Sequence, residues 1–351
     1  MSPRVLVARL DSEGDVLLAG PAVRAVAASP AEVVLLVGRR GRQAAELLPG
    51  ADRVVVWSAP WIDPEPGPVQ SDEVGALVAE LTALAVDEAV LLTSYHQSPL
   101  PLALLLRLAG VRRTTAISDD YPGSLLDVRV RVDDDLPEVE RNLAVAAAAG
   151  FGLPPGDDGL LRLRSPLPDV SDLVGSEPYL VLHPGASVPA RAWSPARCAE
   201  AVELLARHGH RVLVTGSPAE RGLTARVAGD AGVDLGGRTS FAELAAVLAG
   251  AGAVAVGNTG PAHLAAAAGT PVVSLFAPVV PAARWAPYGV PVVLLGDQQA
   301  SCRDSRARVC PVPGHPCLDR VEPAEVLDAV GRLLAGPPAE LVGATAAGGV
   351  R

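Results

Sequence analysis

The sequence predicts an α/β protein made of two doubly wound halves, each with a parallel sheet between helices. Short apolar runs alternate with helical patterns along most of the 351 residues, which is the spacing of strand-helix-strand units. Hydrophobic residues are 49% of the chain and aromatic residues only 3%, so the core is expected to consist largely of Ala, Val and Leu. The alternation dissolves between residues 153 and 178, where Pro, Gly and Ser accumulate, and then restarts.

The first half reads as a repeated strand-helix pattern. Strands are expected at residues 5–8, 33–37, 53–57 and 88–92, with helices after the turn 11–15 and through Ala25, at 44–48 and at 74–85. In the second half, strands are expected at 179–182, 211–215, 251–256 and 271–276, with helices at 195–208, 219–228, 241–249, from about Pro261, and at 323–334. We therefore predict an N-terminal domain at 1–165, a C-terminal domain at 176–336 and a disordered tail at 337–351.

Charge and hydropathy exclude some classes of protein. The formal net charge of −10 argues against nucleic-acid binding, because phosphate backbones require a basic surface. The start of the chain lacks a secretory apolar core, and no apolar stretch long enough to cross a bilayer is free of charges or helix breakers. We expect a soluble cytoplasmic protein, which leaves room for peripheral contact with a membrane surface.

Three of the four cysteines, Cys302, Cys310 and Cys317, lie close in sequence and, with His315, offer a set of zinc-ligand types. None has the close Cys-x-x-Cys pairing of a zinc ribbon, and the charged residues between them are typical of a solvated loop. We favour thiols without a bound metal.

The turn Gly257-Asn258-Thr259-Gly260 follows an apolar run and precedes a helix that begins near Pro261. Glycines allow close approach of a ligand to the backbone, and the free N–H groups and dipole of a helix start favour an anionic oxygen. Thr259 adds a hydroxyl donor, and His263 lies on the first helical turn. The turn predicts a site for a nucleoside diphosphate, although an ordinary connection in any α/β protein would look the same.

Polar turns also follow two other predicted strands of the second half. Ser187 and Arg191 can contact phosphate oxygens, and Glu220 can accept hydrogen bonds from ribose hydroxyls. The alternatives are that Arg191 is a surface cation and that Glu220 only stabilises a helix start.

In the first half, Asp11, Glu13 and Asp15 follow the first strand. A carboxylate at the start of a helix can accept the proton of an attacking hydroxyl, and Asp15 stands directly before an apolar helical run. The alternative for Asp15 is a helix N-cap, and one residue can serve both roles.

Three segments in this order resemble glycosyltransferase family 9, the ADP-heptose:lipopolysaccharide heptosyltransferases. They are residues 9–17 with Gly14-Asp15, the segment HPGAS followed by RAW, and GNTGPAHLAAAAGTP, and the similarity runs from about Arg4 to about Leu334. The resemblance implies a GT-B architecture of two Rossmann-like domains with an interdomain cleft, the acceptor mainly on the first domain and the nucleotide sugar mainly on the second. It also implies inverting transfer without a metal ion or other cofactor.

The resemblance assigns Asp15 as general base, Arg191 as a phosphate contact and Glu220 as the ribose carboxylate. It assigns the family's Asp-Thr-Gly-x-x-His element to Asn258, Thr259, Gly260 and His263. Two departures stand out: Asn258 replaces the usual Asp, and Arg191 replaces a frequent Lys, which changes a point charge into a planar fork.

Acceptor contacts are expected at residues 95–99 and 118–121, with His96, Gln97 and Asp120 as candidates. These segments differ from those of the lipopolysaccharide enzymes. The predicted partners are thus a nucleotide-sugar donor similar to ADP-heptose and a glycan or glycolipid acceptor. The alternatives are a nucleotide-sugar epimerase on the same plan and a nucleotide-sugar binding protein without catalysis.

Overall fold

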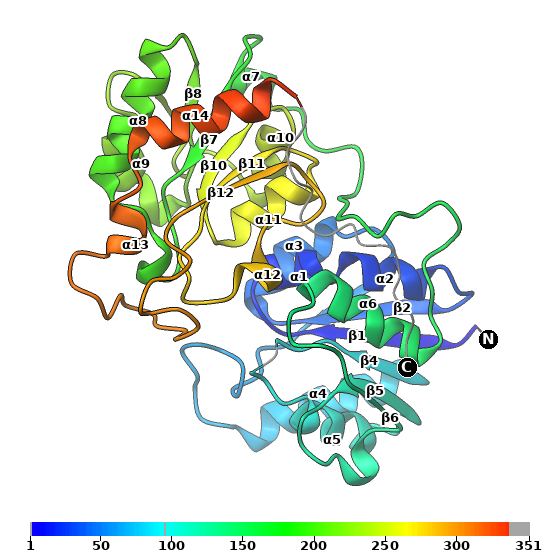
Figure 1. Cartoon of the computed structure of the whole chain (residues 1–351). Coiled ribbons are helices and arrows are strands. Elements are labelled where there is room, and N and C mark those ends of the chain that lie inside the picture. Colours follow the sequence, from blue (N-terminus) through cyan, green and yellow to red (C-terminus); the bar gives the residue numbers. More distant parts are fainter. Residues whose placement is uncertain (1, 95, 337–351) are drawn as a thin grey trace. The chain divides into compact units, whose positions relative to one another are not determined.

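The computed structural model of the chain describes residues 2–94 and 96–336, and the chain divides into two compact units at Arg164 and Ser165 (Figure 1). Each unit is a six-stranded sheet with helices around it. Within the described ranges, no helix is both long enough and apolar enough to cross a bilayer.

The sheet of the first unit has the order β3-β2-β1-β4-β5-β6, and every strand pair is parallel. Its strands are β1 (Arg4–Arg9), β2 (Glu32–Val37), β3 (Arg53–Val56), β4 (Glu88–Leu91), β5 (Arg113–Ile117) and β6 (Val128–Val130). The helices are α1 (Glu13–Leu18), α2 (Gly20–Ala27), α3 (Arg42–Leu47), α4 (Ser71–Leu84), α5 (Leu100–Leu108) and α6 (Glu138–Ala149), with 3-10 turns η1 (Arg39–Gly41) and η2 (Gly123–Leu125). The inner strands bury apolar side chains on both faces, as parallel strands covered by helices require.

The sheet of the second unit has the order β12-β11-β10-β7-β8-β9, again entirely parallel. Its strands are β7 (Leu180–His183), β8 (Val212–Val214), β9 (Val233–Asp234), β10 (Val254–Gly257), β11 (Val272–Leu275) and β12 (Val292–Leu295). The helices are α7 (Ser171–Val174), α8 (Pro195–Arg207), α9 (Arg221–Ala228), α10 (Phe241–Ala249), α11 (Gly260–Ala267), α12 (Ala282–Trp285), α13 (Pro316–Asp319) and α14 (Pro323–Leu334), with 3-10 turns η3 (Pro189–Arg191) and η4 (Pro218–Glu220).

Both sheets share one topology. In each, the strand order reverses beside the first strand, between β1 and β4 in the first unit and between β7 and β10 in the second. Ligands of open α/β sheets bind at the carboxyl ends of the strands at such a reversal. The predicted α/β class with two doubly wound parallel sheets is confirmed, and the two reversals mark where sites should be sought.

Several local predictions differ from the structure. The helix expected through Ala25 is two helices, because Pro21 lacks an N–H and cannot continue the turn that ends at Leu18. Strands β5 and β6 and helices α5 and α6 lie where no element was predicted. Helix α5 has the sequence LPLALLLRL, which is apolar almost all round and so shows no helical period. The predicted disordered tail at 337–351 lies outside the described residues.

Candidate functional site

A buried arginine occupies the carboxyl end of β1. Arg9 has no exposed surface, and its guanidinium lies among three carboxylates. Its Nε is 2.8 Å from Oδ2 of Asp11, its Nη2 donates to Oδ1 of Asp15 at 3.0 Å, and its Nη1 is 3.4 Å from Oε2 of Glu138 on α6. Nη2 also donates to the hydroxyl of Ser94, which follows β4, at 2.8 Å. The cluster therefore spans β1, α1, α6 and the end of β4, at the reversal of the strand order.

Asp15 lies in the first turn of α1, as predicted, with about a fifth of its side chain exposed. Ser12, and not Asp15, is the N-cap residue, so the N-cap alternative for Asp15 is wrong. Oδ2 of Asp15 accepts a hydrogen bond from the hydroxyl of Ser12 at 2.9 Å, while Oδ1 accepts from Arg9. Both carboxylate oxygens are therefore held in place at a partly exposed position.

The protonation of the cluster is set by burial and by charge. Burial alone would lower the pKa of Arg9, but the carboxylates of Asp11, Asp15 and Glu138 outweigh it and raise that pKa above its usual value. The pKa of Asp11 is raised to about 6, chiefly by burial and further by Asp15 and Glu138, against the opposing effect of Arg9. Asp11 therefore gains a proton in mildly acidic solution.

Of the predicted acceptor residues, Gln97 contacts this cluster directly. Its Nε2 donates to Oδ1 of Asp11, and its Oε1 accepts from the backbone N–H of Ser94 at 3.2 Å. His96 is exposed beside it. Asp120 is exposed after β5, the next strand along the sheet. All three lie at carboxyl ends of the strands, and their role toward an acceptor stays a prediction.

In the second unit, the turns that follow β7 and β8 are linked by a contact between side chains. His183, the last residue of β7, is buried, and its Nδ1 lies 3.0 Å from the hydroxyl of Thr215 after β8. Burial lowers the pKa of His183, while Glu220 acts in the opposite direction. Oε2 of Glu220 accepts from both the N–H and the hydroxyl of Ser217 at 2.7 Å.

Glu220 also lies against the turn after β7. A methyl group on Gly185 would come within 1.9 Å of Oε1 of Glu220, so the carboxylate lies directly against this turn. Glu220 therefore does stabilise its own helix start, and it also presents one carboxylate oxygen to the strand-end turn.

Arg191 and the turn after β10 meet through the backbone. A methyl group on Gly257 would come within 2.7 Å of the carbonyl oxygen of Arg191, so η3 passes directly over the end of β10. Arg191 is half-buried there, and Ser187, on the same connection, is exposed. Trp193 is buried in the core, which agrees with a packing role.

Asn258 forms a two-way bridge. Its Nδ2 donates to the carbonyl of Ala277 at 3.2 Å, and its Oδ1 accepts from the N–H of Ala277 at 3.3 Å, in a buried position. The amide thus ties the end of β10 to the segment after β11.

The next residues form the start of α11. Thr259 is its N-cap residue in an extended conformation, Gly260 is the first helical residue, and His263 is buried on the first turn. Thr259 and Gly260 are half-exposed, so their position suits a ligand at the helix start.

The segment with Cys302, Cys310, Cys317 and His315 carries the residue types of a zinc site. Within residues 2–94 and 96–336, no three or more His, Cys, Asp or Glu side chains are arranged to hold a metal ion. Cys302 and Cys317 are buried thiols, and burial and the neighbouring Cys302 and Cys310 raise the pKa of Cys317 to about 12.

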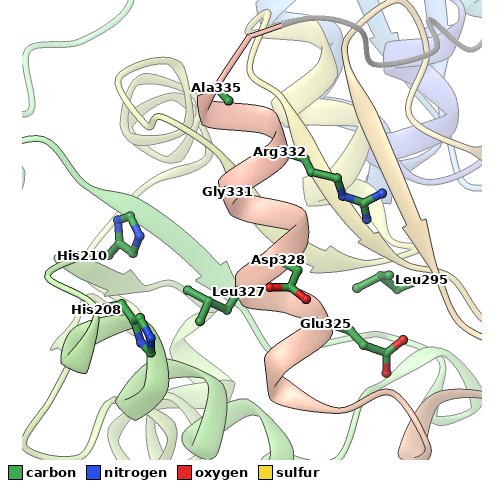
Figure 2. A pocket seen from close by; sticks show the side chains of 9 residues that line it. All are labelled: His208, His210, Leu295, Glu325, Leu327, Asp328, Gly331, Arg332 and Ala335. Atoms are coloured by element: carbon green, nitrogen blue, oxygen red, sulfur yellow. The ribbon is translucent and has the colours of Figure 1, made fainter.

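A groove of about 860 Å³ runs along α14 (Figure 2). It is lined by His208, His210, Leu295, Glu325, Leu327, Asp328, Gly331, Arg332 and Ala335. None of these nine residues belongs to the predicted donor or acceptor sets, so the groove and the strand-end turns are different features of the second unit.

Known proteins match the chain in sequence and in fold. A family model for glycosyltransferase family 9 (heptosyltransferase) matches residues 77–315. Lipopolysaccharide heptosyltransferase 1 of Pseudomonas aeruginosa is 38% identical over 157 residues, which are 43% of this chain and 42% of that protein. The chain thus matches less than half the length of this curated relative.

Solved structures share the fold. The family 9 glycosyl transferase from Veillonella parvula has a TM-score of 0.75 at 16% identity and covers 95% of this chain and 97% of its own. The E. coli heptosyltransferase WaaC with ADP has a TM-score of 0.70 at 21% identity and covers 94% of this chain and 99% of its own. At these identities the likeness shows the fold alone.

Proposed function

The chain belongs to glycosyltransferase family 9, the heptosyltransferase family, and on that premise we propose that it transfers a sugar from a nucleoside-diphosphate sugar to a hydroxyl acceptor. The reaction inverts the anomeric centre and uses no metal ion. We propose a heptose carried by ADP as the donor, which is supported by the family description and by the ADP bound to the E. coli heptosyltransferase WaaC.

Asp15 serves as general base. Its carboxylate is fixed by Arg9 and Ser12 and keeps about a fifth of its surface exposed, so a hydroxyl can reach it. As the acceptor oxygen attacks the anomeric carbon, its proton passes to Asp15 and the bond from that carbon to the diphosphate breaks on the opposite face.

The second unit holds the donor. The N–H groups at the start of α11, with the hydroxyl of Thr259 and the charge of Arg191, stabilise the negative charge that develops on the departing diphosphate. His263, Gly260 and Asn258 shape the same turn, Ser187 adds a hydroxyl, and Glu220 accepts from the ribose.

One observation carries the donor site. The polar turns after β8, β7 and β10 belong to three adjacent strands, and the contact of η3 with Gly257 brings Arg191 to the same edge. Fixed donors and a cation at a reversal of strand order are what an anionic nucleotide requires.

The acceptor is a glycan or glycolipid bound by the first unit, with His96, Gln97 and Asp120 as contacts. A glycolipid acceptor would bring the protein to a membrane surface from the cytoplasmic side.

The test begins with a thermal-shift screen of ADP, UDP, GDP and their sugars, because a ligand of the folded state raises its stability with concentration. We expect ADP and ADP-heptose to raise the Tm most. With ADP-heptose and an acceptor, Asp15→Asn is expected to lower kcat by at least 100-fold, within the range of general base catalysis. Near-normal turnover by Asp15→Asn would disprove the base assignment.

Product analysis separates the alternatives. An epimerase converts the donor sugar without any acceptor, and a binding protein leaves the donor intact at concentrations that raise the Tm. Absence of a shift with every nucleotide would contradict the donor site itself.

A further inference from the structure

Arg9 is an unusual residue for its place. It ends β1, in which residues 5–8 are apolar, and its side chain is completely buried. A charge buried in this way costs several kcal/mol in desolvation, and a buried ion pair is often no more stabilising than apolar residues of similar size. Stability alone therefore does not account for an arginine here.

The geometry of the guanidinium gives it another role. Its nitrogen atoms contact side chains that come from four separate parts of the chain: Asp11 after β1, Asp15 on α1, Ser94 after β4, and Glu138 on α6. The single atom Nη2 donates to both Asp15 and Ser94. Ser94 lies close in sequence to the predicted acceptor residues His96 and Gln97. A planar fork can hold several oxygens in fixed directions at once, which a lysine cannot.

We propose that Arg9 is a positioning residue for the transfer reaction, holding the carboxylate of Asp15 as an anion in one orientation and linking it to the segment after β4. This inference rests on the proposed function, in which Asp15 is the base. Asp11 and Glu138 hold the guanidinium in place and compete with Asp15 for its charge.

The charged groups of the Arg9 cluster and of the segments next to it come from several elements. They are Arg9 and Asp11 from β1 and the residues after it, Glu13 from α1, Arg40 from η1, His96 from the segment after β4, and Glu138 and Arg141 from α6. Arg40 acts on Glu13, and Arg141 lies 3.4 Å from Glu138, while Arg9 contacts Asp15 directly.

A mostly buried arginine elsewhere in the same unit provides a matched control. Arg24 on α2 contacts Asp157 through Nε at 2.7 Å and Nη2 at 2.9 Å, and it also donates to the carbonyl of Leu160. It ties a helix to a connecting segment and touches no predicted site residue. Arg24→Lys therefore disturbs a part-buried ion pair without disturbing the site.

The test compares Arg9→Lys, Asp11→Asn and Arg24→Lys in the full-length protein labelled with ¹³C at aspartate carboxyl groups. The titration midpoint of Asp15, assigned with Asp15→Asn, needs no acceptor to be measured. We expect it to rise in Arg9→Lys, because the ammonium serves fewer of the carboxylates, and to fall in Asp11→Asn, because a competing negative charge is lost. Arg24→Lys should lower the Tm and leave the midpoint unchanged.

Turnover supplies the second measurement. With ADP-heptose as donor, Arg9→Lys is expected to lower kcat on the order of 100-fold, as a small misplacement of a catalytic group does, with little change in KM for the donor. The acid limb of the pH profile should move with the Asp15 midpoint, upward in Arg9→Lys and downward in Asp11→Asn.

The results distinguish a failure of the positioning role of Arg9 from a failure of the proposed function. If Asp15→Asn abolishes transfer but neither variant moves the Asp15 midpoint, Arg9 is only a structural residue. If Asp15→Asn retains transfer, the base assignment fails first. Should Arg9→Lys fail to fold, Asp11→Asn still decides, because an unchanged midpoint there overturns the proposed coupling.

Discussion

Asn258 forms a pair of backbone hydrogen bonds that the aspartate usual at this position in the family could not form. Its amide both donates to and accepts from the backbone of Ala277, and only a group with both functions can do this. An aspartate at the same position would place a carboxylate against the carbonyl oxygen of Ala277. The residue that departs from the family pattern is therefore matched to its surroundings in this chain.

Asn258→Asp is expected to lower the free energy of unfolding by about 1 to 3 kcal/mol at neutral pH, because a buried carbonyl loses its donor. Urea denaturation measures the change. Gln299→Glu, on an exposed loop, is the matched control and should stay within about 0.5 kcal/mol of the parent. If both substitutions changed the free energy of unfolding equally, the hydrogen bonds between Asn258 and Ala277 would make no specific contribution to stability.

Asp11 predicts a pH dependence of stability. Its pKa in the folded state is about 6 and its ordinary value is 3.8, so between these values the folded protein binds more protons than the unfolded chain. Its contribution to stability is complete below pH 3.8 and is lost as the pH rises through 6. The stability of the parent relative to Asp11→Asn should therefore decrease between pH 4 and pH 6, by on the order of 1 to 3 kcal/mol.

Denaturant titrations of both proteins at several pH values measure this difference. His183 has a lowered pKa and so reduces stability as the pH falls below its ordinary value of 6.5, but it is common to both proteins and cancels. A difference that rises with pH would contradict the assignment.

The sequence identified the acidic turn at Asp15 but not its partner. Arg9 stood out only as a charge within an apolar run, and a charge in a buried strand followed by carboxylates at 11 and 15 was the available signal. The contribution of Glu138 could not be predicted, because it comes from α6, which lies far along the chain and was not recognised as a helix. Contacts between distant segments depend on strand order, which local patterns do not give.

Among the elements, the connection from β10 to α11 depends on the absence of a side chain. Gly257 ends β10 where the carbonyl of Arg191 passes at a distance that excludes a methyl group. Gly75, within α4, has no atom within 4 Å of the place where a methyl group would stand. The two glycines therefore predict opposite results for the same substitution.

Gly257→Ala is expected to cost about 1 to 3 kcal/mol by overpacking and to reduce the Tm shift caused by ADP. Gly75→Ala should stabilise the protein by about 0.4 to 1 kcal/mol, because alanine favours the helix. Thermal denaturation with and without ADP gives both values. An unaltered ADP shift in Gly257→Ala would separate this connection from donor binding.

The predicted elements were most accurate where turn signals bounded a clear period. The helices at 241–249 and 323–334 agree with α10 and α14 to the residue, since Ser240 and Pro323 mark their starts. The predicted strands run one residue past the ends of β3, β4, β8 and β11, because apolar side chains continue beyond the last ladder hydrogen bond, whereas β1, β7 and β10 end one residue later than predicted. The region from 93 to 150 was left without elements, since α5 and the alanine-rich α6 lack an alternation of polar and apolar positions.

At the scale of the whole molecule, one topology occurs twice, and the predicted roles divide between the two copies. The base and acceptor candidates belong to the first unit and the donor candidates to the second. A nucleotide without an acceptor should therefore bind to and stabilise mainly the second unit.

Hydrogen exchange with saturating ADP tests this division. We expect slower exchange at residues 183–193, 216–220 and 257–263, because bound ligand suppresses local opening. Segments 9–15 and 94–99 should change little until an acceptor is added. Protection confined to the first unit would reverse the assignment of donor and acceptor.

The repeated strand order also bears on how such a chain can diversify. Each unit closes its own hydrogen-bonded sheet, with its own reversal point, so substitutions that remodel the loops of one leave the scaffold of the other intact. Under the proposed division of roles, a lineage can exchange the acceptor it glycosylates while retaining its activated sugar, and a chimaera joined near residue 165 is a natural vehicle for engineering that exchange.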